Sequence, residues 1–181
     1  MIITGKYPQL RLRRNRYHQW SRKLITENNL SVNDLILPIF IIDGKNKKIP
    51  VKTMPGVFRY SLDKLNSVVQ SAIYLGIPMV ALFPYTKGSL KNPLGTESLN
   101  SNNLVCRACK QIKKKFKNKI GIMCDVALDP YTSHGHDGVF LKGDVDNDET
   151  VKILSEQALI QASAGCDVLA PSDMMDGRIG V

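Results

Sequence analysis

The stretch LILPIFII, residues 35–42, is an unbroken run of apolar side chains. A strand that is buried on both faces has such a run, whereas a strand with one face in water alternates apolar and polar residues. Comparable runs recur as MVALFP (79–84), KIGIMCDVAL (119–128) and DVLAPS (167–172). We therefore expect these segments to form buried parallel strands of an α/β sheet.

Amphipathic helices are predicted between these strands, at residues 61–76, about 101–118 and 147–165. In the first of them, apolar residues recur every three or four positions and give one stripe for the core. Ser61 and Asn147 are the predicted N-caps of the first and third helices. Gly76 and Gly165 are predicted to stop the same two helices.

Repeated strand–helix units predict either a doubly wound sheet or a (β/α)₈ barrel. The phosphate-binding G-x-G-x-x-G is absent, which argues against the dinucleotide-binding version. Polar residues gather after successive strands, at 85–87, 125–137 and 172–178, as in a barrel whose active site lies at the strand ends. The prediction is an α/β fold of the (β/α)₈ TIM-barrel family. A basic N-terminal arm and helix (1–30) would precede about four β/α units (31–181).

Such a partial barrel leaves edge strands unpaired and an apolar inner face uncovered. Dimerisation, an open sandwich or a longer protein would each resolve this problem. The end at Val181, just past an unfinished loop, favours the last solution. We expect the chain to be the N-terminal half, or slightly more, of a longer protein.

The net charge of +9 comes largely from arginines near the start and from KKKFKNK at 113–119. We interpret these as a basic arm and the solvated face of a helix, because no recognition motif with interleaved aromatic residues accompanies them. No nucleic-acid partner is expected. Without a long apolar run or a secretory h-region at the start, we expect a cytoplasmic protein with no membrane partner.

Cysteines occur at positions 106, 109, 124 and 166. Cys106 and Cys109 lie among Val105, Ile112 and Phe116 at helical spacing, so the C-x-x-C is interpreted as core rather than as a metal site. No second pair completes a zinc or disulfide framework.

The segment DVALDPYTSHGHDG (125–138) holds three aspartates and two histidines. Asp125, near the end of a buried strand, needs a partner and is either a site acid or a hydrogen-bonded acid that ties two loops together. The other four form either a metal site or the polar part of a tight turn allowed by Gly135 and Gly138: Asp129, His134, His136 and Asp137.

The run APSDMMDGR (170–178) follows the last predicted strand. Ser172 lacks a G-x-S-x-G elbow, so a substrate hydrogen bond is expected rather than nucleophilic catalysis. The structural alternative has Ser172 or Asp173 capping a helix and Asp176 paired with Arg178.

Together, DVALDPYTSHGHDG, NDETV and LAPSDMMDGRIG resemble the porphobilinogen synthase (5-aminolevulinate dehydratase) family. RLRRNR near the start, MPGVFRYSLDKL (54–65) and ALFP extend the resemblance over nearly the whole chain. It implies a (β/α)₈ barrel and an N-terminal arm that wraps a neighbouring subunit of a homo-octamer. It also implies condensation of two 5-aminolevulinate molecules into porphobilinogen, in tetrapyrrole (haem) synthesis. The two lysines that form Schiff bases with substrate would lie beyond Val181.

The resemblance also assigns roles within the opening segment. Ala127, Asp129 and Asp137 stand where zinc-dependent relatives carry three cysteines, so no catalytic zinc is expected. Mg²⁺ or a monovalent cation would act as activator, bound mainly outside this segment. Asp129, Asp137 and Ser172 would contact substrate, and Asp125 with Ser172 would support catalysis.

Two other hypotheses remain at this point. One is a catalytically inactive truncated remnant or an interaction module. The other is a metal-dependent hydrolase that uses the Asp125–Asp137 loop.

Overall fold

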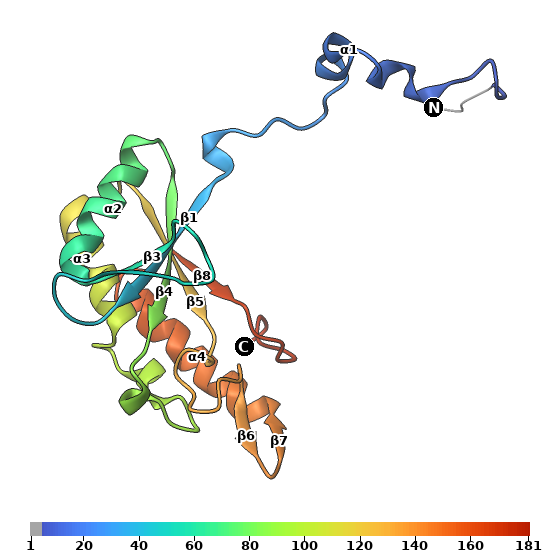
Figure 1. Ribbon diagram of the computed structural model, residues 1–181. Helices are drawn as coiled ribbons and strands as arrows, with labels where there is room; N and C mark the ends of the chain where they lie inside the picture. The colour runs from blue at the N-terminus through green and yellow to red at the C-terminus, as the bar shows by residue number, and fades with distance from the viewer. Residues whose placement is uncertain (1–4) are drawn as a thin grey trace. The chain divides into compact units, whose positions relative to one another are not determined.

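The computed structural model describes residues 5–181 (Figure 1). The chain divides into two compact units, one ending at Ser31 and the other running from Val32 to Val181. The described part of the first unit holds the 3₁₀-helix η1 (Leu12–Arg16) and the short helix α1 (Gln19–Leu24).

The second unit is built on a sheet with the strand order β2-β3-β1-β4-β5-β8. Its four longest strands run parallel to one another: β1 (Ile36–Ile42), β4 (Met79–Tyr85), β5 (Gly121–Val126) and β8 (Val168–Pro171). All four were predicted, with bounds that differ from the observed ones by at most two residues. Each lies beside its predecessor in the sequence, whereas a doubly wound sheet reverses its strand order at a switch point. From β1 to β8 these four strands therefore wind in one direction, as in a barrel.

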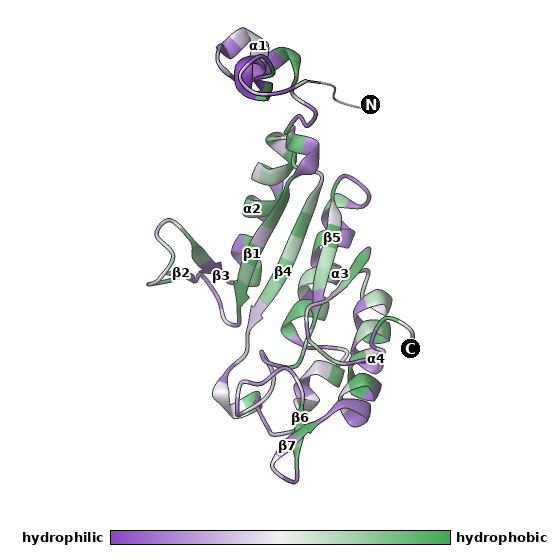
Figure 2. Cartoon of the chain, turned by 90° about the vertical axis from the view of Figure 1, so that its right-hand side faces the viewer, coloured by the Kyte–Doolittle hydropathy of each residue, from purple (hydrophilic) through white to green (hydrophobic). Residues whose placement is uncertain are grey.

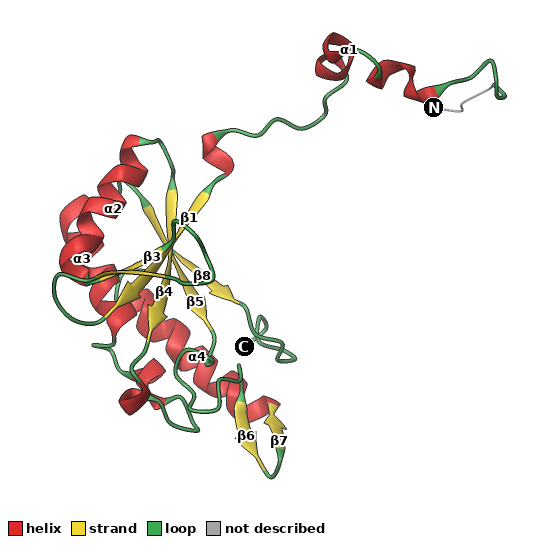
Figure 3. Ribbon diagram, viewed as in Figure 1, coloured by secondary structure: helices red, strands yellow, loops and turns green. Residues whose placement is uncertain are grey.

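The three long helices are α2 (Leu62–Tyr74), α3 (Leu104–Phe116) and α4 (Asn147–Ser163). All three lie on the same face of the sheet (Figure 3). One-sided helices on a sequentially ordered parallel sheet are the arrangement of a partial (β/α)₈ barrel. The predicted fold class is confirmed, and the described sheet does not close.

Several short elements were not predicted. Strand β3 (Phe58–Tyr60) pairs parallel with β1, and β2 (Lys48–Pro50) pairs antiparallel with β3 at the edge of the sheet. Strands β6 (Val139–Leu141) and β7 (Asp144–Asp146) form a separate hairpin. Each has only three residues, too few to show a period. Three 3₁₀-helices complete the unit: η2 (Val32–Asp34), η3 (Gly88–Leu90) and η4 (Thr96–Leu99).

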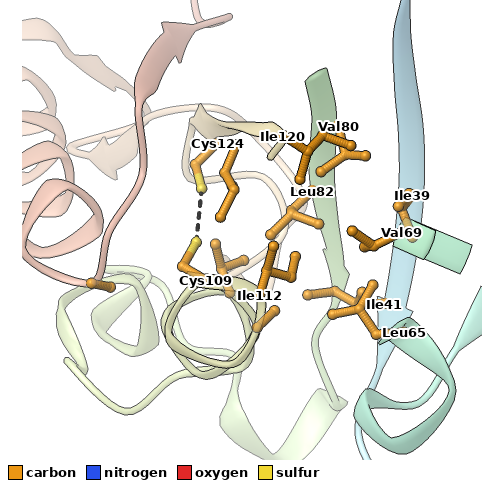
Figure 4. Packing of buried hydrophobic residues seen from close by; sticks show 14 of the residues in the cluster. Ile39, Ile41, Leu65, Val69, Val80, Leu82, Cys109, Ile112, Ile120 and Cys124 are labelled. Atoms are coloured by element: carbon orange, nitrogen blue, oxygen red, sulfur yellow. Dashed lines mark hydrogen bonds between the residues drawn. The ribbon is translucent and has the colours of Figure 1, made fainter. Parts of the chain in front are cut away.

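The main core lies between the sheet and helices α2 and α3 (Figure 4). From the strands, Ile39, Ile41 and Leu82 are at most 2% exposed, and they meet Leu65 of α2 and Ile112 of α3. The predicted helix stripes are confirmed, because the residues buried on α2 and α3 are those of the apolar periodicity.

The other face of the sheet carries no helix in the described chain, and Figure 2 views the sheet from that side. Here Ile36 and Tyr85 are 44% and 48% exposed. The rings of Phe40 and Phe83 lie near each other, with centroids 5.7 Å apart. The expectation of burial on both faces is therefore wrong for these residues, and the open surface is apolar.

The predicted N-cap of α4 is wrong, whereas that of α2 is confirmed in position, although its side chain makes no capping hydrogen bond. Asp146 caps α4, since its side chain accepts a hydrogen bond from the Glu149 N–H (3.0 Å). Asn147 lies inside the helix instead. Ser61 occupies the N-cap position of α2, but its Oγ accepts from the Lys47 N–H at 2.8 Å.

The predicted glycine stops are confirmed. Gly76 and Gly165 follow the ends of α2 and α4 with φ of 76° and 102°, a conformation that favours glycine. Within residues 5–181, no helix is both long and apolar enough to cross a membrane.

Candidate functional site

Asp125 and Ser172 meet at the carboxyl ends of neighbouring strands. Asp125 is paired with Ala170 in the register of β5 and β8, and Ser172 follows β8 directly. The Ser172 Oγ donates a hydrogen bond to Asp125 Oδ1 at 2.6 Å. Since Cys124 and Val126 belong to the helix-covered cores, Asp125 between them points to the open face. The two predicted catalytic residues are thus in contact.

The surroundings of Asp125 raise its pKa. Burial is the largest cause, and the carboxylates of Asp137 and Asp173 add to it, while the Ser172 hydrogen bond acts in the opposite direction. Removing water from a carboxylate disfavours its charged form. Asp125 therefore holds a proton more readily than an exposed aspartate does.

Asp129 and Asp137 belong to the same electrostatic cluster. The pKa of Asp129 is also raised, first by burial and then by the charges of Asp125 and Asp137, with Lys91 opposing. Lys91 Nζ reaches the backbone carbonyl of Asp129 at 3.3 Å. The carboxylate of Asp137 is thus close enough to raise the pKa of both Asp125 and Asp129.

The ring nitrogens of His134 and His136 contact backbone atoms rather than the three aspartates. His134 Nδ1 accepts from the His136 N–H, and His136 Nδ1 accepts from the Gly138 N–H, both at 3.2 Å. His134 Nε2 lies 3.2 Å from the Pro93 carbonyl. Gly135 has φ of 75°, so the tight-turn interpretation applies. Among residues 5–181, no three His, Cys, Asp or Glu side chains converge to hold a metal ion.

Two buried glutamines support the strand end, and sequence reasoning missed both. Gln157 and Gln161 of α4 are fully buried. Gln161 Nε2 donates to the Asp125 carbonyl at 2.9 Å, and Gln157 Nε2 donates to the carbonyl of buried Ala127 at 3.2 Å. The available signal was their spacing of one helical turn on the inward side of α4.

The loop after β8 is held by Asp173, which is 2% exposed. Its Oδ1 accepts from the Met175 N–H at 2.7 Å, and its Oδ2 lies 3.7 Å from Arg178 Nε. The predicted Asp176–Arg178 pair is wrong. Arg178 faces Asp173, while the Asp176 backbone bonds to the Asn147 side chain. No helix follows Ser172 within the described chain, so neither Ser172 nor Asp173 caps a helix.

A second charged group lies at the ends of β1 and β4. Asp43 Oδ1 accepts from Arg107 Nη2 at 3.1 Å and its Oδ2 accepts from Lys87 Nζ at 3.2 Å. Hydrogen bonds from Arg107 and then Lys87 lower the pKa of Asp43. Arg59 also stacks on the Tyr85 ring, with 4.9 Å to the centroid. Sequence reasoning missed Asp43 and Arg107 because their partners are far along the chain.

The fold and these groups define a partial (β/α)₈ barrel that carries its functional side chains at the carboxyl ends of its strands. The family model described as Delta-aminolevulinic acid dehydratase matches residues 9–181. The chain belongs to this family, as the resemblance implied.

Individual relatives agree with that assignment. A delta-aminolevulinic acid dehydratase of Bradyrhizobium diazoefficiens is 55% identical over 170 residues, covering 94% of this chain and 48% of the relative. One of Chlamydia pneumoniae is 46% identical, covering 94% of this chain and 51% of the relative. The chain thus spans about half the length of these relatives.

A solved structure agrees as well. The delta-aminolevulinic acid dehydratase (porphobilinogen synthase) of Toxoplasma gondii, in complex with the reaction product porphobilinogen, superposes with a TM-score of 0.87. It is 42% identical, and the match covers 94% of this chain and 49% of that one.

Proposed function

We propose that this chain forms the Asp125–Ser172 part of a porphobilinogen synthase active site. The complete enzyme would condense two 5-aminolevulinate molecules into porphobilinogen, for tetrapyrrole synthesis. The observation that carries the proposal is the 2.6 Å contact between Ser172 and Asp125 at adjacent strand ends, in a chain of this family. The Toxoplasma gondii structure with bound porphobilinogen supports the choice of product.

The condensation requires protons to move as bonds between the two substrates form and water leaves. A carboxyl group whose pKa is raised toward neutrality suits such transfers. In the proposal Asp125 accepts or returns a proton, and Ser172 fixes its orientation. Asp129 and Asp137 line the same region and contact the amino or hydroxyl groups of substrate.

In this proposal, the lysines that form Schiff bases with substrate lie outside residues 1–181. Two lysines of the chain invite comparison, and the ion pair of Lys87 argues against that residue. Lys87 is paired with Asp43, and Lys142 occupies the turn of the β6–β7 hairpin with φ of 53°. A lysine that attacks a carbonyl needs a free amine, and the Lys87 amine is engaged by the Asp43 carboxylate.

We further propose that the site works without catalytic zinc. The positions that hold thiolates in zinc-dependent relatives are Ala127, Asp129 and Asp137, which offer a methyl group and carboxylates. Zinc sites in proteins are built mainly from sulfur and nitrogen ligands. Mg²⁺ or a monovalent cation, bound mainly elsewhere, would be the activator. Metal analysis of active protein checks this, and stoichiometric zinc at the site contradicts it.

The N-terminal unit is proposed to mediate homo-oligomer formation, an octamer by resemblance. Its exposed apolar side chains support this: Tyr17, Trp20 and Leu24 are 79%, 67% and 79% exposed. Large exposed apolar groups mark association surfaces. Light scattering on the chain with and without residues 1–31 tests it, with a smaller assembly expected after deletion.

A chimera tests the main proposal. This chain replaces the matching half of the Bradyrhizobium diazoefficiens relative, and porphobilinogen formation is measured. The chimera is expected to be active, and Asp125→Asn is expected to lower kcat by about 10²–10⁴-fold, as for a lost general acid or base. Borohydride with 5-aminolevulinate is expected to trap substrate on lysines of the relative's half.

The outcomes separate the alternatives. A chimera that assembles but forms no product favours an inactive remnant. A borohydride adduct with turnover on the 181-residue chain alone contradicts the proposed lysine location. The metal-dependent hydrolase is disfavoured by the family match and by the backbone contacts of His134 and His136.

A further inference from the structure

Helix α4 carries two glutamines on its buried side. Val151 and Leu154 lie on that side and pack in a hydrophobic cluster, and Gln157 and Gln161 continue it one and two turns later. Both glutamines are 0% exposed. A leucine or methionine at either position would fill similar space without burying an amide. Packing alone therefore does not account for the glutamines.

Each of these side-chain amides is satisfied on one side only. Gln161 Nε2 donates to the Asp125 carbonyl at 2.9 Å, and Gln157 Nε2 donates to the Ala127 carbonyl at 3.2 Å. The Oε1 atoms of both glutamines are buried, and no donor within residues 5–181 reaches them. A buried acceptor without a partner destabilises a fold. What the two glutamines contribute is therefore the pair of hydrogen bonds that they donate.

Those hydrogen bonds hold the end of strand β5. The two accepting carbonyls flank Val126, the last residue of the strand. The register of β5 with β4 ends at Cys124, whereas the register with β8 continues to Val126. The amides of α4 thus add fixed points where the pairing with β4 has stopped. Because the backbone direction at a residue sets where its Cβ points, fixing the Asp125 carbonyl also fixes the direction of its side chain.

We propose that Gln161 is a positioning residue of the active site, which holds the Asp125 carboxyl at hydrogen-bonding distance from Ser172. Gln157 assists from two residues further along the strand end. This inference rests on the proposed function, because it assigns how the Asp125–Ser172 pair is held. Gln161 contacts the backbone of Asp125 rather than its carboxyl group, so it acts through geometry. The distance that it maintains is the 2.6 Å between Ser172 Oγ and Asp125 Oδ1.

Loss of the Gln161 hydrogen bond has a predictable direction at Asp125. The hydrogen bond from Ser172 lowers the pKa of Asp125, whereas burial and the charges of Asp137 and Asp173 raise it. A looser strand end weakens the Ser172 contact and leaves the opposing causes in place. The pKa of Asp125 is therefore expected to rise when Gln161 cannot donate.

Carboxyl ¹³C NMR on the full 181-residue chain measures this effect. Gln161→Met keeps an unbranched side chain of similar length but removes the donor. The Asp125 titration, assigned with Asp125→Asn, is expected to move to higher pH in Gln161→Met. A smaller movement in the same direction is expected in Gln157→Met, because its bond is to Ala127.

Gln111→Met supplies the matched control. Gln111 Nε2 also donates to a backbone carbonyl, that of Leu62 at 2.7 Å, but this bond joins α3 to α2 rather than to β5. The substitution removes the same kind of hydrogen bond. It is expected to leave the Asp125 titration unchanged.

The chimera with the Bradyrhizobium diazoefficiens relative gives the kinetic test. Gln161→Met is expected to lower kcat by about ten- to a hundredfold with little change in KM, because a displaced proton-transfer group loses rate while substrate contacts persist. The limb of the pH–rate profile that belongs to Asp125 is expected to move to higher pH, as the NMR titration does. Gln111→Met is expected to leave both unchanged.

Urea denaturation establishes that each variant folds. The inference is overturned if folded Gln161→Met titrates at Asp125 as the unvaried chain does, or moves no further than Gln111→Met. If Gln161→Met does not fold, an unmoved titration in Gln157→Met overturns it instead.

The kinetic outcomes separate this inference from the proposed function. If Asp125→Asn lowers kcat in the chimera and Gln161→Met does not, the inference is overturned and the proposed function stands. If Asp125→Asn leaves kcat unchanged, the catalytic role of Asp125 is overturned. A moved titration in Gln161→Met would then still support Gln161 as the residue that positions Asp125.

Discussion

The two faces of the β1–β4–β5–β8 sheet are made from equally apolar strands and have different surroundings. Ile39 faces the helices and is 2% exposed, whereas Ile36, three residues earlier in the same strand, faces the open side and is 44% exposed. The first face holds the core of this unit, and the second carries the aspartates of the candidate site at its edge. An apolar run therefore shows that both faces are suited to burial, and the partners present decide which face is buried.

The largest expected effect comes from the helix-covered face. Ile39→Ala is expected to lower the free energy of unfolding by about 2–5 kcal/mol, because the deleted carbons leave a cavity in a packed core. Urea denaturation measures it. A loss under about 1 kcal/mol would show that the core around Ile39 is not packed as described.

The second prediction concerns a charge at the edge of the open face. The raised pKa of Asp125 means that the folded chain binds its proton more tightly than the unfolded chain does. Stability therefore falls as pH rises from the ordinary carboxyl range through the raised pKa. Asp125→Asn is expected to raise the thermal midpoint at neutral pH, with the gain vanishing in acid. The gain should be smaller than the loss for Ile39→Ala.

An aspartate-to-asparagine substitution at Asp43 supplies the control. The pKa of Asp43 is lowered by Arg107 and Lys87, so its contribution to stability is present above the ordinary pKa and is lost as pH falls through the lowered one. Asp43→Asn should therefore lower the neutral midpoint. Equal signs for the two variants would contradict the described electrostatics.

The smallest effect is expected for Ile36→Ala on the open face. The same atoms are removed as in Ile39→Ala, but from a side chain that is already 44% exposed, so a change within about 0.5–1 kcal/mol is expected. Denaturation of both variants under one set of conditions gives the comparison. An equal loss at the two positions would mean that something covers the open face in solution.

Apolar patterning was sufficient to predict the four longest parallel strands and the buried stripe of α2. It failed where an element is short or where a contact is distant in sequence. The three-residue strands β2 and β3 have no measurable period. The α4 cap was placed one residue late because Asp146 and Asn147 are both good caps, and only the loop after β8 decides between them.

For the candidate site, residue type and position after a strand identified Asp125 and Ser172. Their hydrogen bond depends on the β5–β8 register, which the sequence does not state. The buried glutamines were missed because long polar residues on a helix normally face water. The pairing of Arg178 with Asp173 rather than Asp176 follows from the burial of Asp173, which only the folded loop creates.

The sequential order of the parallel strands has a consequence for how this unit is made. As β4, β5 and β8 leave the ribosome, each finds its neighbour already synthesised, so no strand has to wait for a later segment before it pairs. Each closing loop spans one strand–helix unit, which keeps the entropy of closure modest. The sheet is thus suited to vectorial, co-translational growth from β1 toward β8.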